Sequence, residues 1–224
     1  MTGDRLLPAG AHVDHEGVWV QRLREPRWKR PVPALFLDRD GVVVVEVNYL
    51  HRIEDARLER GAAEAIGSAN RLGVPVVFVT NQAGIGYGYF GWPEFAAVQE
   101  KILTDLAAAG AFVDAVLACP HHAKGQPPYD HPDHPARKPN PGMLTRAASL
   151  LDLDLARSWM VGDRASDLEA AKRAGLEGAV HVLTGHGSRE GEEAKCQAVA
   201  GPRFRVRTAP SIAEAIPLLP VLET

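Results

Sequence analysis

The feature that most constrains the fold is an alternation of short apolar runs with longer helical patterns. Five runs are candidate strands and a sixth is weaker: 34–37, 74–80, 115–119, 158–162, 178–183 and 204–208. Short continuous apolar runs are typical of strands that are buried on both faces. Helical patterns bounded by glycine, proline or serine lie between them, at 58–73, 93–110, 141–154 and 166–175. The alternation predicts one α/β domain over residues 34–224 with a mainly parallel sheet.

The composition is that of a globular protein and argues against several functional classes. Of the 224 residues, 46% are hydrophobic and 24% are charged, which is ordinary for a folded domain. The net charge of -3 argues against a dedicated nucleic-acid-binding protein. No apolar run is long enough for a membrane helix, and the N-terminus lacks the pattern of a signal peptide. The chain has only two cysteines, so we expect no disulfide framework. We further predict a cytoplasmic monomer that has neither nucleic-acid nor membrane partners.

The first 33 residues differ from the rest of the chain. They carry proline, glycine and mixed charge, and they are predicted to form a peripheral N-terminal extension. Within them, GVWVQRL (17–23) is a candidate short strand or arm. Nothing in this segment indicates chemistry.

Two carboxylates follow the first candidate strand, in the sequence Asp38-Arg39-Asp40-Gly41. Because side chains alternate along a strand, Asp38 and Asp40 are expected to project one way and Arg39 the other. Two adjacent carboxylates repel unless a cation lies between them or one is protonated. The pair therefore suits Mg²⁺, or a division between a nucleophile and a proton-transfer group. The simpler interpretation is a turn rich in Asp and Gly.

Polar residues also follow later strands. Thr80-Asn81-Gln82-Ala83 offers a hydroxyl, two amides and backbone N–H groups that suit a phosphate. Asp163 and Arg164 follow the fourth run, and Asp167 lies at the start of a helix. The pair Arg137-Lys138, next to prolines, suits a dianion. Each has a simpler interpretation, as a turn, a helix cap or a solvated basic turn. Ligands in parallel sheets bind beyond the carboxyl ends of the strands, where these residues lie.

Taken together, these segments resemble the four ordered motifs of the haloacid dehalogenase (HAD) superfamily. The resemblance rests on Asp38-x-Asp40-Gly41, Thr80-Asn81, Lys138 and Gly162-Asp163-x-x-x-Asp167, and it covers about residues 34–190. It implies a HAD-like Rossmannoid three-layer sandwich. The stretches from Gly41 to the second strand and from Thr80 to Lys138 are too short for a cap domain. We therefore expect loops 46–55, 84–92 and 119–136 to shape the pocket.

The longer segments narrow the resemblance. FLDRDG, VTNQAGIGYGYF, CPHH and RKPNPGM are similar to the subfamily of the D-glycero-D-manno-heptose 1,7-bisphosphate 7-phosphatases and the histidinol-phosphatase domains, and closer to the former. The implied reaction is Mg²⁺-dependent hydrolysis of a sugar phosphomonoester, with the heptose 7-phosphate as the leading substrate. Other functions stay open. The substrate could be histidinol phosphate or a different small phosphomonoester, and the phosphoryl group could pass to an acceptor other than water. The chain could also be a non-catalytic phosphate-binding relative. For the heptose substrate, no residue in the sequence favours the α or the β anomer.

The resemblance also implies roles for individual residues. Asp38 would be the nucleophile that forms an aspartyl phosphate, and Asp40 would be the acid and base. Thr80 and Lys138 would hold the phosphoryl group. Mg²⁺ would be bound by Asp38, the Asp40 backbone carbonyl and Asp163, with Asp167 in support.

Substrate recognition is expected from several further residues. Arg137 and the stretch Glu46-Val47-Asn48-Tyr49 would recognise the sugar. The residues after two strands would also contact substrate, namely Asn81, Gln82, Ala83 and Arg164. Tyr87 stands where relatives often carry arginine, which could weaken a phosphate contact or alter the substrate preference.

In the family, the loop after the third strand carries a structural zinc held by a C-x-H pair and a C-x-C pair. Cys119 and His121 match the first pair, but His134 and Ala136 occupy the second. Alanine cannot bind zinc, so the fourth ligand would be His131 or His122, or the site is empty. The alternative is a metal-free surface loop stiffened by its prolines.

Overall fold

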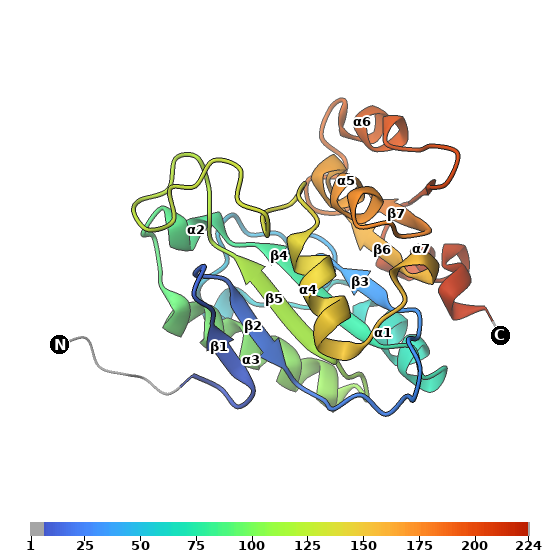
Figure 1. Ribbon diagram of the computed structural model, residues 1–224, viewed down its shortest axis with the longest axis horizontal. Helices are drawn as coiled ribbons and strands as arrows, with labels where there is room; N and C mark the ends of the chain where they lie inside the picture. The colour runs from blue at the N-terminus through green and yellow to red at the C-terminus, as the bar shows by residue number, and fades with distance from the viewer. Residues whose placement is uncertain (1–6, 224) are drawn as a thin grey trace.

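An eight-stranded sheet crosses the molecule in the order β1-β2-β5-β4-β3-β6-β7-β8 (Figure 1). The structure, a computed structural model, describes residues 7–223. The strands are β1 (Ala11–Val13), β2 (Trp19–Arg22), β3 (Leu35–Leu37), β4 (Val76–Asn81), β5 (Ala115–Cys119), β6 (Trp159–Gly162), β7 (Gly178–Val182) and β8 (Arg205–Ala209). Strands β3 to β8 pair in parallel, whereas β1 and β2 are antiparallel additions. All six predicted strands are confirmed, each within two residues at either end.

Helices cover both faces of the sheet, which makes three layers. One face carries α1 (Ala62–Arg71), α3 (Trp92–Ala108) and α7 (Ile212–Ala215), and the other carries α4 (Gly142–Leu151), α5 (Ala165–Arg173) and α6 (Glu192–Ala198). Short helical turns occupy α2 (Ala83–Gly86), Ile53–Asp55, Leu155–Arg157, Ile216–Leu218 and Pro220–Leu222. The four predicted helices are confirmed, whereas α6, α7 and the short turns lay outside the prediction.

The central strand β3 explains why both faces are covered. Leu35 and Leu37 belong to one apolar cluster and Phe36 belongs to the other, and all three side chains are fully buried. Side chains alternate across a strand, so a run of three apolar residues needs apolar partners on both faces. The stretch between β3 and β4 holds loops, one short helical turn and α1, and the stretch from β4 to Lys138 holds α2, α3, β5 and loops. Within residues 7–223, no cap domain interrupts the sheet.

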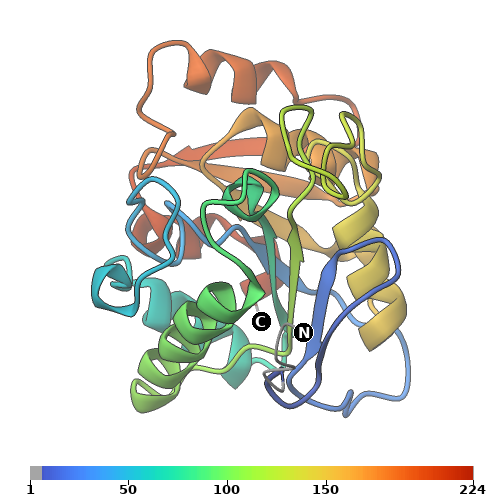
Figure 2. The ribbon, with the colours of Figure 1, turned by 90° about the vertical axis from the view of Figure 1, so that its left-hand side faces the viewer.

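The N-terminal segment differs from expectation. The predicted strand in residues 17–23 is confirmed as β2, which pairs with β5, and β1 extends the same edge (Figure 2, blue strands). The Trp19 side chain is fully buried and stacks on Trp92 at 5.5 Å between ring centroids. These strands are therefore part of the sheet and its core rather than a peripheral extension. A domain boundary at residue 33 stays a prediction.

The parallel register places three strand ends side by side. Strand β3 pairs with β4 on one side and with β6 on the other, with Leu37 opposite Phe78 and Val161. The residues that follow these strands therefore face one edge of the sheet. Within residues 7–223 there is also no helix of the length and apolarity needed to cross a membrane.

Candidate active site

A cavity of about 320 Å³ opens at the carboxyl ends of β3, β4 and β6. Every residue predicted to bind substrate or magnesium lines it except Val47, namely Asp38, Asp40, Glu46, Asn48, Tyr49, Thr80, Asn81, Gln82, Ala83, Arg137, Lys138, Asp163, Arg164 and Asp167. Val47 instead packs against the hydrophobic core. The fold thus brings together residues that are up to 129 positions apart, from Asp38 to Asp167.

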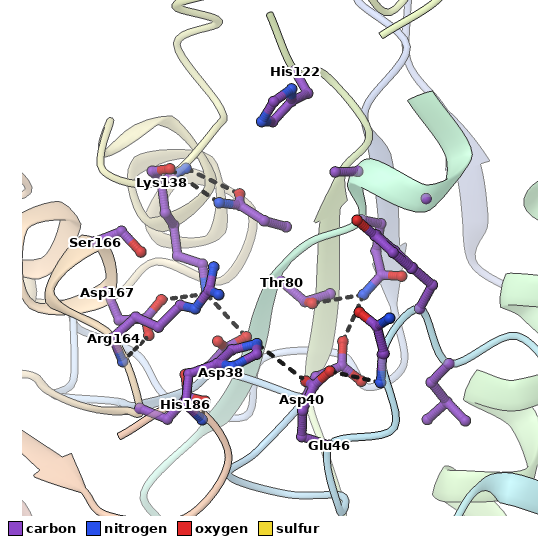
Figure 3. Close-up of a pocket in the computed structure, with 18 of the residues that line it drawn as sticks. Asp38, Asp40, Glu46, Thr80, His122, Lys138, Arg164, Ser166, Asp167 and His186 are labelled. Carbon is purple, nitrogen blue, oxygen red and sulfur yellow. Dashed lines mark hydrogen bonds and ion pairs between the residues drawn. The ribbon is translucent and has the colours of Figure 1, made fainter. Parts of the chain in front are cut away.

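Lys138 is the centre of the buried network (Figure 3). Its Nζ lies 2.9 Å from Asp38 Oδ1 and 2.6 Å from Asp167 Oδ1, and it donates to the Val79 carbonyl at 2.8 Å. Burial alone would lower the pKa of Lys138, but the carboxylates of Asp167 and Asp38 outweigh burial and raise the pKa. The lysine is therefore a fixed positive charge.

Asn81 positions Lys138 through the lysine's backbone. Asn81 Nδ2 donates to the Lys138 carbonyl at 3.0 Å, and the Lys138 N–H donates to Asn81 Oδ1 at 3.1 Å. The pair of bonds ties the end of β4 to a segment 57 residues away. A substrate contact by Asn81 stays a prediction, whereas the structure shows that its side chain is bonded to the backbone of the lysine.

Three buried carboxylates surround the lysine. One oxygen each of Asp38, Asp163 and Asp167 lies within 4.8 Å of the others. Burial raises the pKa of Asp38 to about 7, with Lys138 opposing the shift and Asp167 adding to it. Burial and the neighbouring carboxylates of Asp38 and Asp167 raise the pKa of Asp163 to about 8. Three carboxylates against one lysine leave excess negative charge, which fits a divalent cation with oxygen ligands.

Asp40 is held apart from this cluster by two other side chains. Arg39 Nε and Nη2 donate to its two carboxylate oxygens at 3.0 and 2.9 Å. Gln82 Nε2 donates to Asp40 Oδ2 and to Thr80 Oγ1, both at 2.9 Å. The expectation that Arg39 projects away from Asp40 is wrong, because the fully buried guanidinium bends back to Asp40 and lies 5.3 Å above the Phe95 ring. The buried charge needs this partner.

Two glycines let loops close on Asp163. Gly41 has φ +80°, and a Cβ there would lie 2.4 Å from Asp163 Oδ2. Gly185, in the loop after β7, has φ +57° and would place a Cβ 2.3 Å from the same oxygen. The next residue, His186, donates its backbone N–H to Asp163 Oδ2 at 2.7 Å. The conformation that glycine adopts without a steric penalty is needed at both positions.

The loop after β7 was missed as part of the site. His186 and Arg189 line the cavity although neither was predicted as part of the site, and His186 Nε2 lies 3.9 Å from Glu46 Oε2. Ser166 also lines the cavity without having been predicted. The available signal was the position of residues 184–189 directly after a predicted strand. In the strand before this loop, His181 is fully buried.

The rim of the cavity comes from the expected loops. Glu46 and Tyr49 come from loop 46–55, Tyr87 from loop 84–92 and His122 from loop 119–136. Arg137 Nη1 donates to the His121 carbonyl at 2.7 Å, so its guanidinium is anchored to the third loop. The rim therefore mixes aromatic and cationic side chains above the acidic centre.

The donors expected for zinc do not converge on one point. Among residues 7–223, the group of Asp38, Asp163 and Asp167 is the only one in which three or more donor atoms lie within 4.8 Å of one another. The rings of His121 and His134 are parallel within 4°, with centroids 3.8 Å apart. Imidazole lone pairs lie in the ring plane, so two stacked rings do not point at one ion.

Other contacts occupy the same histidines. His134 Nδ1 accepts the Ala136 N–H at 3.1 Å and lies 4.0 Å from Cys119 Sγ, and His121 Nε2 donates to the Glu16 carbonyl at 2.7 Å. Burial and neighbouring histidines lower the pKa of His134 to about 4. The residues present do not fit the expected tetrahedral zinc site.

Comparison with known proteins places this arrangement in a family. The family model for HAD-hydrolase-like proteins matches residues 135–214. The D-glycero-beta-D-manno-heptose-1,7-bisphosphate 7-phosphatase of Mesorhizobium japonicum is 44% identical over 93% of this chain and 90% of that protein. The D-glycero-alpha-D-manno-heptose-1,7-bisphosphate 7-phosphatase of Photorhabdus laumondii is 36% identical over 72% of this chain and 88% of its own length.

A solved structure is also similar to this chain. The D,D-heptose 1,7-bisphosphate phosphatase of B. bronchiseptica, complexed with magnesium and phosphate, superposes with a TM-score of 0.72 at 32% identity. The match covers 84% of this chain and 98% of that one. The chain therefore belongs to the HAD-like phosphatases, in the same family as the heptose-bisphosphate phosphatases, and is a phosphoric monoester hydrolase.

Proposed function

We propose that this enzyme removes the 7-phosphate of D-glycero-D-manno-heptose 1,7-bisphosphate in a Mg²⁺-dependent reaction. The observation that carries the proposal is the buried cluster of Asp38, Asp163 and Asp167 around Lys138, beside Asp40 and Thr80. The names of the similar proteins support the heptose substrate. These names include both anomers, so the proposal covers either one.

Mg²⁺ would be held by the carboxylates of Asp38 and Asp163, with the Asp40 carbonyl as a further ligand and Asp167 in support. When bound, it supplies positive charge that keeps the acidic cluster ionised and offsets the charge of the phosphoryl oxygens. The raised pKa values of Asp38 and Asp163 describe the cluster without that charge. A nearby cation lowers the pKa of a carboxyl group.

Asp38 is proposed as the nucleophile. One of its carboxylate oxygens forms a bond to phosphorus while the bond from phosphorus to the sugar oxygen breaks, leaving an aspartyl phosphate. Lys138 lies 2.9 Å from Asp38 Oδ1 and can offset negative charge on the transferring group. The Thr80 hydroxyl lines the same cavity and can donate to a phosphoryl oxygen. Fixed charges of this kind stabilise the transition state because they need no rearrangement during the reaction.

Asp40 is proposed as the acid and base. In the first step it gives its proton to the departing sugar oxygen, and in the second it takes a proton from the water that attacks the aspartyl phosphate. The second step releases phosphate and returns Asp38 as a carboxylate and Asp40 as an acid. Arg39 and Gln82 hold the Asp40 carboxyl group in one orientation.

Phosphate release from a panel of substrates tests this proposal. The panel holds both heptose 1,7-bisphosphate anomers, fructose 1,6-bisphosphate and histidinol phosphate, each with Mg²⁺ and with EDTA. We expect Mg²⁺-dependent turnover with a clear preference for one heptose anomer. A preference for histidinol phosphate would replace the substrate assignment, and equally weak turnover of all four would remove the heptose assignment while leaving the phosphatase chemistry.

Two further properties are proposed, the oligomeric state and the cellular location. The chain is expected to act as a monomer in the cytoplasm, because its net charge is negative and both of its cysteines are free and buried. Size-exclusion chromatography with light scattering tests the first property, and cell fractionation tests the second. Zinc is not included in the proposal, because the stacked histidines do not fit it.

A further inference from the structure

Three tyrosines form a continuous aromatic surface beside the phosphate cavity. The ring centroids of Tyr49 and Tyr89 are 5.1 Å apart, those of Tyr87 and Tyr89 are 5.4 Å apart, and those of Tyr49 and Tyr87 are 6.0 Å apart. We call Tyr49, Tyr87 and Tyr89 the tyrosine wall. The His122 ring abuts its outer end, 5.1 Å from Tyr87. Tyr49, Tyr87 and His122 line the cavity that contains Asp38 and Lys138.

The tyrosine wall is too exposed to be explained as core packing. Tyr49 is 40% exposed and Tyr89 is 62% exposed. Large aromatic side chains that remain exposed at the edge of a concave site are typical of ligand contacts. Their phenol groups keep a hydrogen-bonding tip in water, so the same surface can contact both carbon and hydroxyl groups.

The backbone is shaped to bring the two loops of the wall together. Asn48 and Tyr49 have φ +35° and +62°, the left-handed region that side-chain-bearing residues rarely adopt. On the other loop, a Cβ at Gly84 would lie 3.2 Å from the Tyr49 ring and 2.4 Å from Phe90. Such strain and close approach persist where the surrounding structure requires one geometry, and they gather at ligand sites.

The phosphate cavity and the tyrosine wall beside it differ in chemistry. The acidic cluster with Lys138 and Thr80 suits a phosphoryl group, whereas the tyrosine wall carries no charge. A pyranose ring presents C–H bonds on its face, and the negative face of an aromatic ring attracts the positive edges of such groups. An acyclic polyol chain offers no rigid face to match a flat surface. The wall therefore suits the ring of a substrate whose phosphate occupies the cluster.

We propose that the tyrosine wall binds one face of the substrate's sugar ring while the phosphate of the same substrate occupies the acidic cluster. This contact gives the enzyme a preference for ring-containing over acyclic phosphomonoesters. The proposal rests on the proposed hydrolysis at Asp38, and it adds a specificity surface of this chain's own residues. Tyr87 and Tyr89 contribute through ring contact, so they are specificity residues and take no part in the bond-breaking step.

The test compares kcat/KM for pyranose and acyclic substrates in leucine variants of the wall. The pyranose substrates are glucose 6-phosphate and the preferred heptose bisphosphate, and the acyclic substrate is glycerol 3-phosphate. We expect Tyr87→Leu and Tyr89→Leu to lower the ratio of pyranose to acyclic kcat/KM about fivefold, mainly through KM, since aromatic contacts contribute modestly. Tyr87→Phe keeps the ring and is expected to retain most of the ratio.

Phe112→Leu is the matched control. Phe112 is an aromatic residue of similar exposure, 46%, and it precedes β5 at the opposite end of the strand from the cavity. This variant is expected to leave both rates at the level of the wild type. Because Tyr89 is mostly exposed, Tyr89→Leu is expected to fold normally, and circular dichroism and the melting temperature check this for every variant.

The outcomes separate this inference from the proposed function. If the wild type prefers a heptose bisphosphate but the leucine variants keep its ratio of pyranose to acyclic kcat/KM, the inference is overturned and the proposed function stands. If heptose bisphosphates are poor substrates but the ratio still falls with glucose 6-phosphate, the inference stands and the heptose assignment fails. An equal loss on both substrate types overturns the inference, because it assigns the wall to the phosphoryl group or to folding.

Discussion

The acidic cluster at Asp38 and the histidine loop that follows β5 both carry family motifs, but they are built in different ways. The cluster draws its members from the ends of adjacent parallel strands and from the start of α5, and Lys138 is paired with two of the carboxylates. The histidine loop, residues 119–136, has lost one expected ligand at Ala136, and its rings stack on one another. Motif residues keep their geometry where regular elements position them, whereas a loop can exchange one set of contacts for another.

The largest expected effect breaks the chemistry of the acidic cluster alone. Asp38→Asn keeps the shape of the side chain but removes the nucleophile, so we expect kcat to fall by about 10⁴-fold or more. We expect the variant to fold normally, since it replaces a buried carboxyl group whose pKa is already raised. Phosphate release and the melting temperature are the measurements. Turnover within tenfold of the wild type would remove Asp38 from the role of nucleophile.

The second effect breaks the charge balance of the cluster. Lys138→Met leaves the buried carboxylates of Asp38 and Asp167 without their cation, and we expect a loss of about 3–5 kcal/mol in the free energy of unfolding. Lys101→Met is the control, because Lys101 pairs with Asp105 on the surface and should cost under about 1 kcal/mol. Urea denaturation at pH 7 measures both. Equal losses of unfolding free energy in the two variants would show that the buried ion pairs of Lys138 contribute no more than the surface pair of Lys101.

The third effect joins the two regions through Arg137. Its guanidinium lines the cavity and donates to the His121 carbonyl, so the histidine loop positions this side chain at the cavity. We expect Arg137→Ala to lower kcat/KM on the sugar bisphosphate by about 10- to 100-fold, the range of one charged hydrogen bond. On p-nitrophenyl phosphate the loss should be clearly smaller. An equal loss on both substrates would place Arg137 on the reacting phosphoryl group.

The fourth effect contrasts how the stability of the two regions depends on pH. Without metal, raised pKa values of about 7 and 8 mean that the folded state binds more protons than the unfolded state above pH 4. The contribution of Asp38 and Asp163 to stability should therefore fall as the pH rises from about 4 to 8. His134 has a lowered pKa of about 4, so its contribution should be lost as the pH falls from 6.5 towards 4.

Melting temperatures across pH 4–9, with EDTA or with Mg²⁺, measure both trends. Mg²⁺ should remove the loss at high pH by binding the ionised cluster, and it should leave the loss at low pH in place. His134→Gln should reduce only the loss at low pH. A loss at high pH that Mg²⁺ leaves unchanged would contradict the assignment of the acidic cluster as the metal site.

The sequence alone determined the α/β fold and the position of the acidic cluster. Short apolar runs must be buried on both faces, and parallel strands bring their carboxyl ends to one edge, so Asp38, Thr80 and Asp163 had to meet there. The local pattern was sufficient for these residues because each lies at the carboxyl end of a strand or directly after it. The loop after β7 obeyed the same rule, and His186 could have been found by applying it once more.

Other features depended on contacts between distant segments. Trp19 enters the core because β2 pairs with β5, and Asn81 orients Lys138 across 57 residues. Arg39 bends back to Asp40 because a fully buried guanidinium must find a carboxylate. The parallel rings of His121 and His134 likewise depend on how the loop packs. Burial and pairing are properties of the folded chain, so only the tertiary structure decided which polar groups became partners.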